Sequence, residues 1–289
     1  MSNHPADQGS YIVLSHFQIR DFFSTLSQSI PKISYDLGLS TVPVSINSES
    51  LKLPDGSALQ FDTLREMMAD ERYCYLVEDG NVKKLMFYSD SKSSVYKMIP
   101  TEDAPALEIS GILMHRIKNT TPWEDAKAKI RFLQPEGSVL DTNCGFGYTA
   151  IQASEQGCNV TTVEIDTNVL ELARYNPWSK KLFERSSQIK LLQGDIFELI
   201  NEFDTAQFDS VIHDPPTLGR AESLYSLEFY QKLKRVLKPG GKLFHYIGAP
   251  GSRARGINLM SNVKSKLRKT GFNKIQTDPE LASLIAIRN

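Results

Sequence analysis

The sequence predicts an α/β protein in two parts: a small, mostly β module over residues 1–110, and a domain over residues 111–289 in which helices cover a parallel sheet. Short alternating runs rich in Val, Ile and Tyr fill the first part, and the stretch "MIPTEDAPALEIS" at residues 98–110 interrupts this composition. After it, short apolar strands alternate with amphipathic segments. With 289 residues and 40% hydrophobic content, the chain can bury a sizeable core.

The first part contains the strand-like runs "TVPVSI", "RYCYLVEDGNVKKLMFY" and "SSVYKMI". Glu78-Asp79-Gly80-Asn81 lies inside the second run and predicts a hairpin turn. The segments "SHFQIRDFFSTLSQ" and "FDTLREMMADE" predict helices. We expect this module to bind the substrate or to close over it as a lid.

The second part begins with a helix, because Thr121-Pro122-Trp123-Glu124 is a capping box with proline at the first helical position. The runs "SVLDT", "NVTTVEI", "IKLLQ", "FDSVIH" and "GKLFHYI" predict buried strands, and "TNVLELARY" and "LYSLEFYQKLKRVL" predict the helices between them. The final "GFNKIQTDPELASLIAIRN" has two strand-like runs around Asp278-Pro279 and predicts an antiparallel hairpin.

Charge and cysteine content limit the environment and the partners. The 33 Lys and Arg residues nearly balance 34 Asp and Glu residues, so the net charge of −1 gives no general attraction to nucleic acid or to anionic membranes. No apolar run is long enough to span a membrane, and we expect a soluble, cytoplasmic protein without a membrane partner. Three scattered cysteines without metal-ligand spacing fit a reducing compartment, and no metal site is expected.

A glycine-containing turn follows the first strand of the second part. "VLDTNCGFGYTAIQAS" places Gly145, Gly147 and Ala150 in a G-x-G-x-x-A arrangement, in which glycine lets the backbone approach a ligand beside a helix N-terminus. Glu164 ends the next strand, 23 residues after Asp141, where a carboxylate can accept hydrogen bonds from ribose hydroxyls. Together these features indicate a cofactor that contains a nucleoside, and the same pattern serves NAD.

The motifs "VLDTNCGFGYTA", "VTTVEID", "LLQGDIFEL", "FDSVIHDPPT" and "LKPGGKLFHY" resemble, in order, those of the class I S-adenosylmethionine-dependent methyltransferases, over roughly residues 121–289. The resemblance is closest to a group of predicted archaeal and bacterial methyltransferases. It implies a Rossmann-like, seven-stranded sheet with S-adenosylmethionine as cofactor. It also implies that the loop from Asp141 through Asn143 and Gly145 to Gly147 wraps the methionine part, that Glu164 holds the ribose, and that Asp195 reaches the adenine amine.

Asn143 departs from the family pattern, since it occupies a position where the family usually has glycine. Asparagine tolerates left-handed backbone better than other non-glycine residues, so we expect the turn to survive.

Asp214 follows the fourth strand of the second part, within "VIHDPPT". Proline ends a strand, and the carbonyl groups it leaves free can face a ligand. In the N-methyltransferases that the motif resembles, the acid and the following carbonyl grip an amine, which implies catalytic roles for Asp214 and Pro215 and substrate contacts for Pro216 and Thr217. Thr217 stands where base-directed enzymes usually have an aromatic residue, which weakens a nucleobase substrate. His115 and His213 lie near the proposed site segments, but we assign neither a catalytic role.

The substrate stays open at this stage. We expect methylation of an amine-bearing substrate, either an RNA base or a small molecule. RNA would need the basic run "SRARGINLMSNVKSKLRK", with Arg253, Arg255, Lys264, Lys266, Arg268 and Lys269. The alternatives are a polyamine aminopropyltransferase that uses decarboxylated S-adenosylmethionine, a dehydrogenase that binds NAD, and a binding module without activity. The oligomeric state is not predicted.

Overall fold

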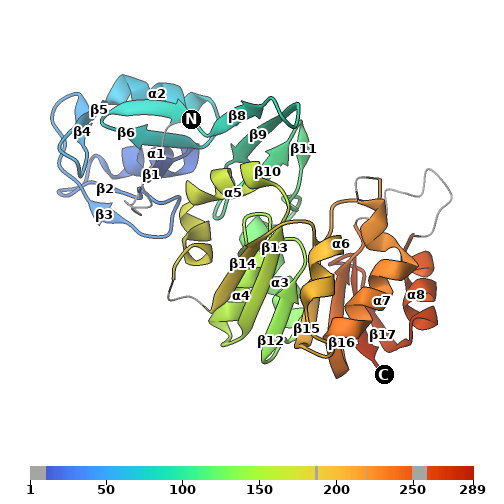
Figure 1. Cartoon of the computed structure of the whole chain (residues 1–289). Helices are drawn as coiled ribbons and strands as arrows, with labels where there is room; N and C mark the ends of the chain where they lie inside the picture. Colours follow the sequence, from blue (N-terminus) through green and yellow to red (C-terminus); the bar gives the residue numbers. More distant parts are fainter. Residues whose placement is uncertain (1–10, 186–187, 220, 249–258) are drawn as a thin grey trace. The chain divides into compact units, whose positions relative to one another are not determined.

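The computed structural model describes residues 11–185, 188–219, 221–248 and 259–289. The chain divides into two compact units, the first made of residues up to 122 together with 171–180, and the second of residues 123–170 and 181–289 (Figure 1). The boundary between two domains at residue 110 was predicted from composition alone, and it stays a prediction.

The first unit is mostly β, as predicted. Its elements are β1 (Ile12–Leu14), α1 (His16–Thr25), β2 (Lys32–Ile33), β3 (Val42–Pro43), β4 (Ser50–Lys52), β5 (Ala58–Gln60), α2 (Phe61–Ala69), β6 (Tyr75–Glu78), β7 (Asn81–Lys84), β8 (Met86–Ser89), β9 (Ser94–Ile99), β10 (Ala106–Ile109) and β11 (Ile112–Leu113). They form a sheet in the order β1-β6-β7, a sheet in the order β11-β10-β9-β8, and the small pairs β2-β3 and β4-β5.

Local sequence explains the clearest of these elements. Ser15 and Gln18 form a capping box that starts α1, and α1 and α2 bury apolar residues in one core with β4, β5 and β6. Asp79 and Gly80 both have positive φ, at 49° and 73°, which makes the tight β6–β7 hairpin that the sequence predicted. The indole nitrogen of Trp178 donates a hydrogen bond to the Leu37 carbonyl, which ties residues 171–180 to this unit.

The second unit contains the large sheet. Its elements are α3 (Pro122–Leu133), β12 (Ser138–Asp141), α4 (Tyr148–Glu155), β13 (Asn159–Glu164), α5 (Thr167–Arg174), the 3₁₀ helix η1 (Pro177–Leu182), β14 (Ile189–Gln193), α6 (Ile196–Leu199), η2 (Ile200–Glu202), β15 (Phe208–His213), η3 (Glu222–Tyr225), α7 (Leu227–Val236), β16 (Leu237–Tyr246), α8 (Leu259–Lys269), β17 (Phe272–Asp278) and β18 (Ser283–Arg288). Residues 171–180, which include the end of α5 and the start of η1, are grouped with the first unit.

The sheet has seven strands in the order β14-β13-β12-β15-β16-β18-β17. Strands β12 to β16 pair in parallel, whereas β18 pairs antiparallel with both β16 and β17. The predicted Rossmann-like sheet and its terminal hairpin are therefore confirmed. From β12 the chain adds β13 and β14 on one side and then β15 and β16 on the other. The strand order thus reverses at β12, and such a switch point creates the crevice where open α/β sheets bind ligands.

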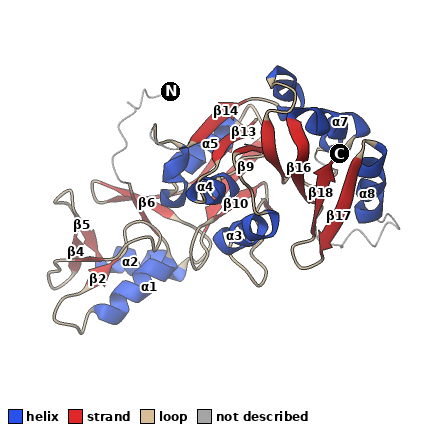
Figure 2. Cartoon of the chain, turned by 90° about the horizontal axis from the view of Figure 1, so that it is seen from below, coloured by secondary structure: helices blue, strands red, loops and turns tan. Residues whose placement is uncertain are grey.

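Helices cover both faces of this sheet, and the strands supply alternate residues to the two layers (Figure 2). Val139 of β12 packs with α3 and α4 on one face, and Leu140 packs with the layer of α6, α7 and α8 on the other. This double burial explains why the central strands have continuous apolar runs.

Candidate active site

Four acidic residues lie along the carboxyl edge of four adjacent strands. Asp141 ends β12, Glu164 ends β13, Asp195 follows β14, and Asp214 follows β15. Because the sheet order is β14-β13-β12-β15, the four residues follow one another along this edge. The structure thus brings together the acids that the sequence singled out from four separate segments.

The loop between β12 and α4 has the backbone conformation that its glycines permit. Gly145 and Gly147 have φ angles of 56° and 79°, in the left-handed region that favours glycine. A Cβ atom added to Gly147 would come within 3.0 Å of the Leu182 side chain, so glycine is also required for close packing. The backbone N–H of Cys144 donates to the Val163 carbonyl and holds the loop against β13.

Asn143 does not have a left-handed backbone, because positive φ occurs in this loop only at Gly145 and Gly147. The explanation expected from the sequence, that asparagine substitutes for glycine through its tolerance of positive φ, is therefore wrong. The turn survives because this position does not require positive φ. The Asn143 side chain lies in the loop with its Oδ1 2.7 Å from the Thr142 hydroxyl.

Glu164 organises the crevice through both of its carboxylate oxygens. Oε2 accepts a hydrogen bond from the backbone N–H of Gly145 at 2.8 Å, and Oε1 accepts one from that of Asp166 at 2.9 Å. Burial raises the pKa of Glu164 above its ordinary value. Each carboxylate oxygen can accept a further hydrogen bond, so the side chain can still receive the hydroxyls of a ribose.

Asp141 is fully buried and only half satisfied. Its Oδ2 accepts hydrogen bonds from the hydroxyls of Thr149 and Thr162, both at 3.1 Å, whereas Oδ1 has no partner among the described residues. Burial raises the pKa of Asp141 to about 7. A buried oxygen without a partner is costly, and a donor group on a ligand would satisfy it. This orphaned acceptor, the left-handed glycine loop and Glu164 fit a ligand with an amine at one end and a nucleoside at the other.

Asp195 caps α6, because its carboxylate accepts the backbone N–H of Phe197 at 2.8 Å. The preceding Gly194 donates its N–H to the Glu164 carbonyl at 2.9 Å. Asp195 therefore follows directly on a residue that is hydrogen-bonded to the last residue of β13. The side chain is exposed, and its predicted contact with the adenine amine stays a prediction.

Asp214 has one oxygen paired within the protein. Its Oδ2 lies 2.6 Å from Nζ of Lys129, and Oδ1 makes no hydrogen bond to a described residue. Pro215 is buried, whereas Pro216 and Thr217 are exposed. The Pro216 carbonyl accepts a hydrogen bond from the Tyr225 hydroxyl at 3.1 Å. The roles of Asp214, Pro215, Pro216 and Thr217 toward a substrate stay predictions.

Lys129 is the functional candidate that sequence reasoning missed. It lies on α3 with 7% of its surface exposed, and its ammonium is shared between Asp214 and Asp125. A sequence signal for Lys129 was present. Position 129 is next to Ile130 and three residues after Ala126, on the apolar side of the predicted helix. A lysine at such a position is buried and needs a charged or hydrogen-bonding partner. The partner Asp214, which follows β15, is 85 residues away and could not be predicted from the spacing.

The histidines near the site have structural roles. His213 is fully buried; its Nε2 donates to the Leu224 carbonyl at 3.0 Å and its Nδ1 accepts from the Thr142 hydroxyl at 2.8 Å. Burial lowers its pKa to about 3, so the ring is neutral. Nδ1 of His115 accepts the backbone N–H of Leu107 in the first unit.

The aromatic residues of the segment "LYSLEFYQ" and the basic run that RNA binding would need differ in exposure, and Arg268 and Lys269 of that run are exposed. Tyr225, Phe229 and Tyr230 are core residues, at most 2% exposed. Lys266 donates a hydrogen bond to the Tyr225 carbonyl. Arg253 and Arg255 lie outside the described residues.

Other kinds of site receive no support from the described part of the chain. The three cysteines are free and buried. Within residues 11–185, 188–219, 221–248 and 259–289, no cluster of His, Cys, Asp or Glu could hold a metal ion, and no helix is long and apolar enough to cross a membrane.

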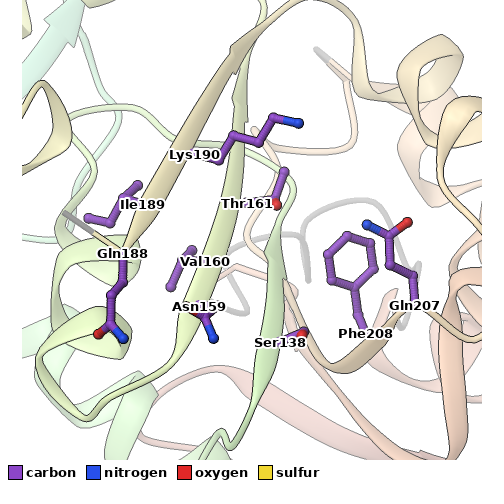
Figure 3. Close-up of a pocket in the computed structure, with 9 residues that line it drawn as sticks. All are labelled: Ser138, Asn159, Val160, Thr161, Gln188, Ile189, Lys190, Gln207 and Phe208. Carbon is purple, nitrogen blue, oxygen red and sulfur yellow. The ribbon is translucent and has the colours of Figure 1, made fainter. Parts of the chain in front are cut away.

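A hollow of 330 Å³ lies at the opposite edge of the sheet (Figure 3). Its lining includes the first residues of four strands, Ser138, Asn159, Ile189 and Phe208. The other lining residues, which Figure 3 labels, are Val160, Thr161, Gln188, Lys190 and Gln207. None of the predicted site residues lines this hollow, because it marks the amino ends of the strands and the chemistry of such sheets is at the carboxyl ends.

Comparisons with known proteins agree with this fold. The "Spermine/spermidine synthase domain" family model matches residues 154–278. "Uncharacterized protein MJ1233" of Methanocaldococcus jannaschii is 44% identical over 239 residues, which cover 82% of this chain and 81% of that protein. "Polyamine aminopropyltransferase 2" of Streptomyces coelicolor is 30% identical over 192 residues, 63% of this chain but only 34% of that protein. "Putative methyltransferase YqeM" of Bacillus subtilis is 32% identical over 124 residues, 43% of this chain and 45% of that protein.

Among solved structures, the crystal structure of spermidine synthase in complex with the transition state analogue AdoDATO superposes with a TM-score of 0.55 at 17% identity, covering 71% of this chain and 73% of that one. The likeness shows the fold: a seven-stranded mixed sheet together with a mostly β N-terminal region.

Proposed function

The chain belongs to the family of the archaeal protein MJ1233, and we propose that it is a transferase that moves an aminopropyl group from decarboxylated S-adenosylmethionine to an amine. The observation that carries this proposal is the row of acidic residues along the carboxyl edge of β14, β13, β12 and β15. The spermine/spermidine synthase match supports it, because residues 154–278 contain Glu164, Asp195 and Asp214.

The charges at this edge favour cationic ligands. Asp141, Glu164, Asp195 and Asp214 lie there with Lys129, whose ammonium is already neutralised by Asp214 and Asp125. S-adenosylmethionine has an α-carboxylate beside its amine, and this negative charge would approach the buried Asp141. Decarboxylated S-adenosylmethionine has the amine alone, so it suits the orphaned Oδ1 of Asp141. A polyamine acceptor is also a cation and is attracted by the same field.

Within this proposal the residues have separate tasks. The glycine loop and Asp141 bind the amine end of the donor, Glu164 binds the ribose, and Asp195 reaches the base. The sulfonium of the donor supplies a carbon that is already activated for displacement. Asp214 orients the acceptor amine in line with that carbon, and such positioning can contribute roughly 7–11 kcal/mol to catalysis.

Methyl transfer from S-adenosylmethionine to an amine is the second candidate. The Asp214-Pro215-Pro216 motif and the similarity to YqeM favour it. Both reactions displace a sulfonium with an amine, and they differ in which carbon of the donor is attacked. RNA bases stay possible acceptors only for this second candidate.

One experiment separates the two candidates. The purified protein is incubated with either donor, each with linear aliphatic diamines, spermidine or RNA as acceptor, and the nucleoside product is identified by mass spectrometry. Aminopropyl transfer yields 5′-methylthioadenosine, whereas methyl transfer yields S-adenosylhomocysteine. Asp214→Ala is the blank. Formation of S-adenosylhomocysteine alone replaces the first candidate by the second, and no product with any acceptor rejects both.

A further inference from the structure

Asp125, Lys129 and Asp214 form a buried charged triad at the carboxyl edge of the sheet. Nζ of Lys129 lies 2.7 Å from Oδ2 of Asp125, one helical turn earlier on α3, and 2.6 Å from Oδ2 of Asp214. Asp125 is 4% exposed and Lys129 is 7% exposed. The side chain of Asp214 is 23% exposed, so the triad reaches the crevice through this residue.

The lysine is an ammonium in this place. Burial alone would lower the pKa of Lys129, but the carboxylates of Asp214 and Asp125 raise it above its ordinary value. Nζ also lies 4.8 Å from the ring centroid of Tyr246, the last residue of β16, which is an attractive arrangement for a cation. The positive charge is therefore held between the ends of β15 and β16.

A role in stability alone does not explain the triad. Burying charged groups is costly, and well-packed apolar residues usually stabilise a core at least as well as a buried ion pair. The neighbouring pair Lys127–Glu124 on the same helix shows the ordinary alternative, with both side chains about half exposed at 48% and 52%. The buried pair differs because it contacts the acid that follows β15.

The two oxygens of Asp214 are consequently unequal. Lys129 occupies Oδ2, and Oδ1 makes no hydrogen bond to a described residue. The carboxylate is thus held by one oxygen and presents the other. A second ammonium at Oδ1 would lie close to the ammonium of Lys129, and like charges at such distances disfavour each other.

We propose that Lys129 is a positioning residue of the transfer reaction: it aligns Asp214 so that Oδ1 receives the acceptor amine, and its ammonium offsets part of the negative charge of Asp125 and Asp214, so that the bound amine loses its proton to become the nucleophile more readily than it would beside the two carboxylates alone. This inference rests on the proposed function only in requiring an amine acceptor, and it holds for aminopropyl or methyl transfer.

The step balances without a further reactant. The acceptor R–NH3⁺ releases one proton to solvent on binding, and the nitrogen lone pair of R–NH2 then forms the new N–C bond. The C–S bond breaks and its electron pair stays on sulfur, which becomes a neutral thioether. The product is a secondary ammonium, which loses its proton after the transfer.

The test compares Lys129→Met and Lys129→Arg with wild type, and uses Lys127→Met as the matched control on the exposed side of the same helix. Binding of a linear diamine in the presence of 5′-methylthioadenosine is measured by calorimetry in buffers of different ionisation enthalpy, which gives the protons released per amine bound. This readout does not require turnover. Where turnover occurs, kcat and KM are measured across pH.

We expect wild type and Lys127→Met to release about one proton more per amine than Lys129→Met, because removing the lysine leaves two carboxylates that favour an ammonium. For Lys129→Met, the pH at which kcat is half-maximal should rise by about one unit or more, with KM for the amine unchanged or lower. Lys129→Arg should restore the wild-type proton release.

Equal proton release in wild type and Lys129→Met overturns the inference, as does an activity loss that follows only the folded fraction at every pH. Failure of amine binding in wild type is a separate outcome: it rejects the amine acceptor, and with it both the proposed function and the role of Lys129. Thermal denaturation of each variant and binding of the donor show whether the fold and the donor site are intact.

Discussion

Oε2 of Glu164 accepts the backbone N–H of Gly145 at 2.8 Å, so the acid that ends β13 is joined to the glycine loop that follows β12. The loop and the acid follow or end neighbouring parallel strands, and the hydrogen bond joins them at the carboxyl edge of the sheet. The loop and the acid that the sequence assigned to the methionine and ribose parts of one ligand are therefore one structural unit.

Substituting Glu164 tests this unit. We expect Glu164→Gln to weaken binding of the S-adenosyl donor by roughly 10- to 100-fold, because a hydrogen bond to a charged acceptor contributes about 1.5–3 kcal/mol. Calorimetric titration with the donor measures the effect. Glu202→Gln, at an exposed position of η2, is the control and should bind as wild type does. Equal affinity of Glu164→Gln and wild type would remove Glu164 from the donor site.

Asp141 should make stability depend on pH in a definite direction. Its pKa rises from 3.8 to about 7 in the folded state, so folding is favoured when this group is protonated, and the benefit is lost as pH rises between these values. Asp141→Asn should therefore gain stability over wild type as pH rises through this window, on the order of 4 kcal/mol in total. Thermal denaturation across pH measures the difference. A difference that is the same at every pH contradicts the prediction.

His213 should act in the opposite direction. Its pKa falls from 6.5 to about 3 in the folded state, so its contribution is complete above 6.5 and is lost as pH falls toward 3. His213→Gln should be less stable than wild type at neutral pH by about 1–3 kcal/mol, because a buried hydrogen-bonding pair is broken. The difference should shrink in acid, and chemical denaturation at several pH values checks it. A gap that widens in acid would show that the folded state accepts the proton.

Gly147 offers a test of local packing. Both Gly147 and Gly157 have positive φ, at 79° and 88°, but only at Gly147 would a Cβ meet another side chain, that of Leu182. Each alanine substitution should cost about 1–2 kcal/mol for the left-handed backbone, and Gly147→Ala should cost more than Gly157→Ala because of the contact.

The double variant Gly147→Ala with Leu182→Ala isolates this contact. Shortening Leu182 should recover part of the additional loss caused by Gly147→Ala, measured as a coupling free energy by denaturant unfolding. Additive losses would mean that Leu182 moves away without cost. Donor affinity of Gly147→Ala should fall in parallel, since the same loop lines the crevice.

Several elements could be predicted from the sequence because their signals are local. The hairpin at Asp79 and Gly80 follows from turn residues, and the strands of the large sheet follow from short apolar runs buried on both faces. The antiparallel end of the sheet, β17 and β18, was also predicted, because two strand-like runs are separated only by a turn.

The candidate site was predicted less completely. Glu164 and Asp214 were identified from their positions at strand ends, and Asp141 and Asp195 from the resemblance to the class I methyltransferases. The sheet brings all four to one edge, because the carboxyl ends of parallel strands meet there. The expected conformation of Asn143 was wrong, since a φ angle does not follow from residue type.

The sequence by itself determined the strand and helix pattern, the order of the acidic residues along the chain, and the glycine loop. Only the tertiary structure decided that Lys129 is shared between Asp125 and Asp214, that Asp141 keeps one oxygen without a partner among the described residues, and that His213 is a neutral structural group. Hydrophobic periodicity and turn chemistry act over a few residues and can be read locally. Burial and charge pairing depend on segments that are distant in the chain. These two properties decide whether an acidic or basic side chain has a structural or a chemical role.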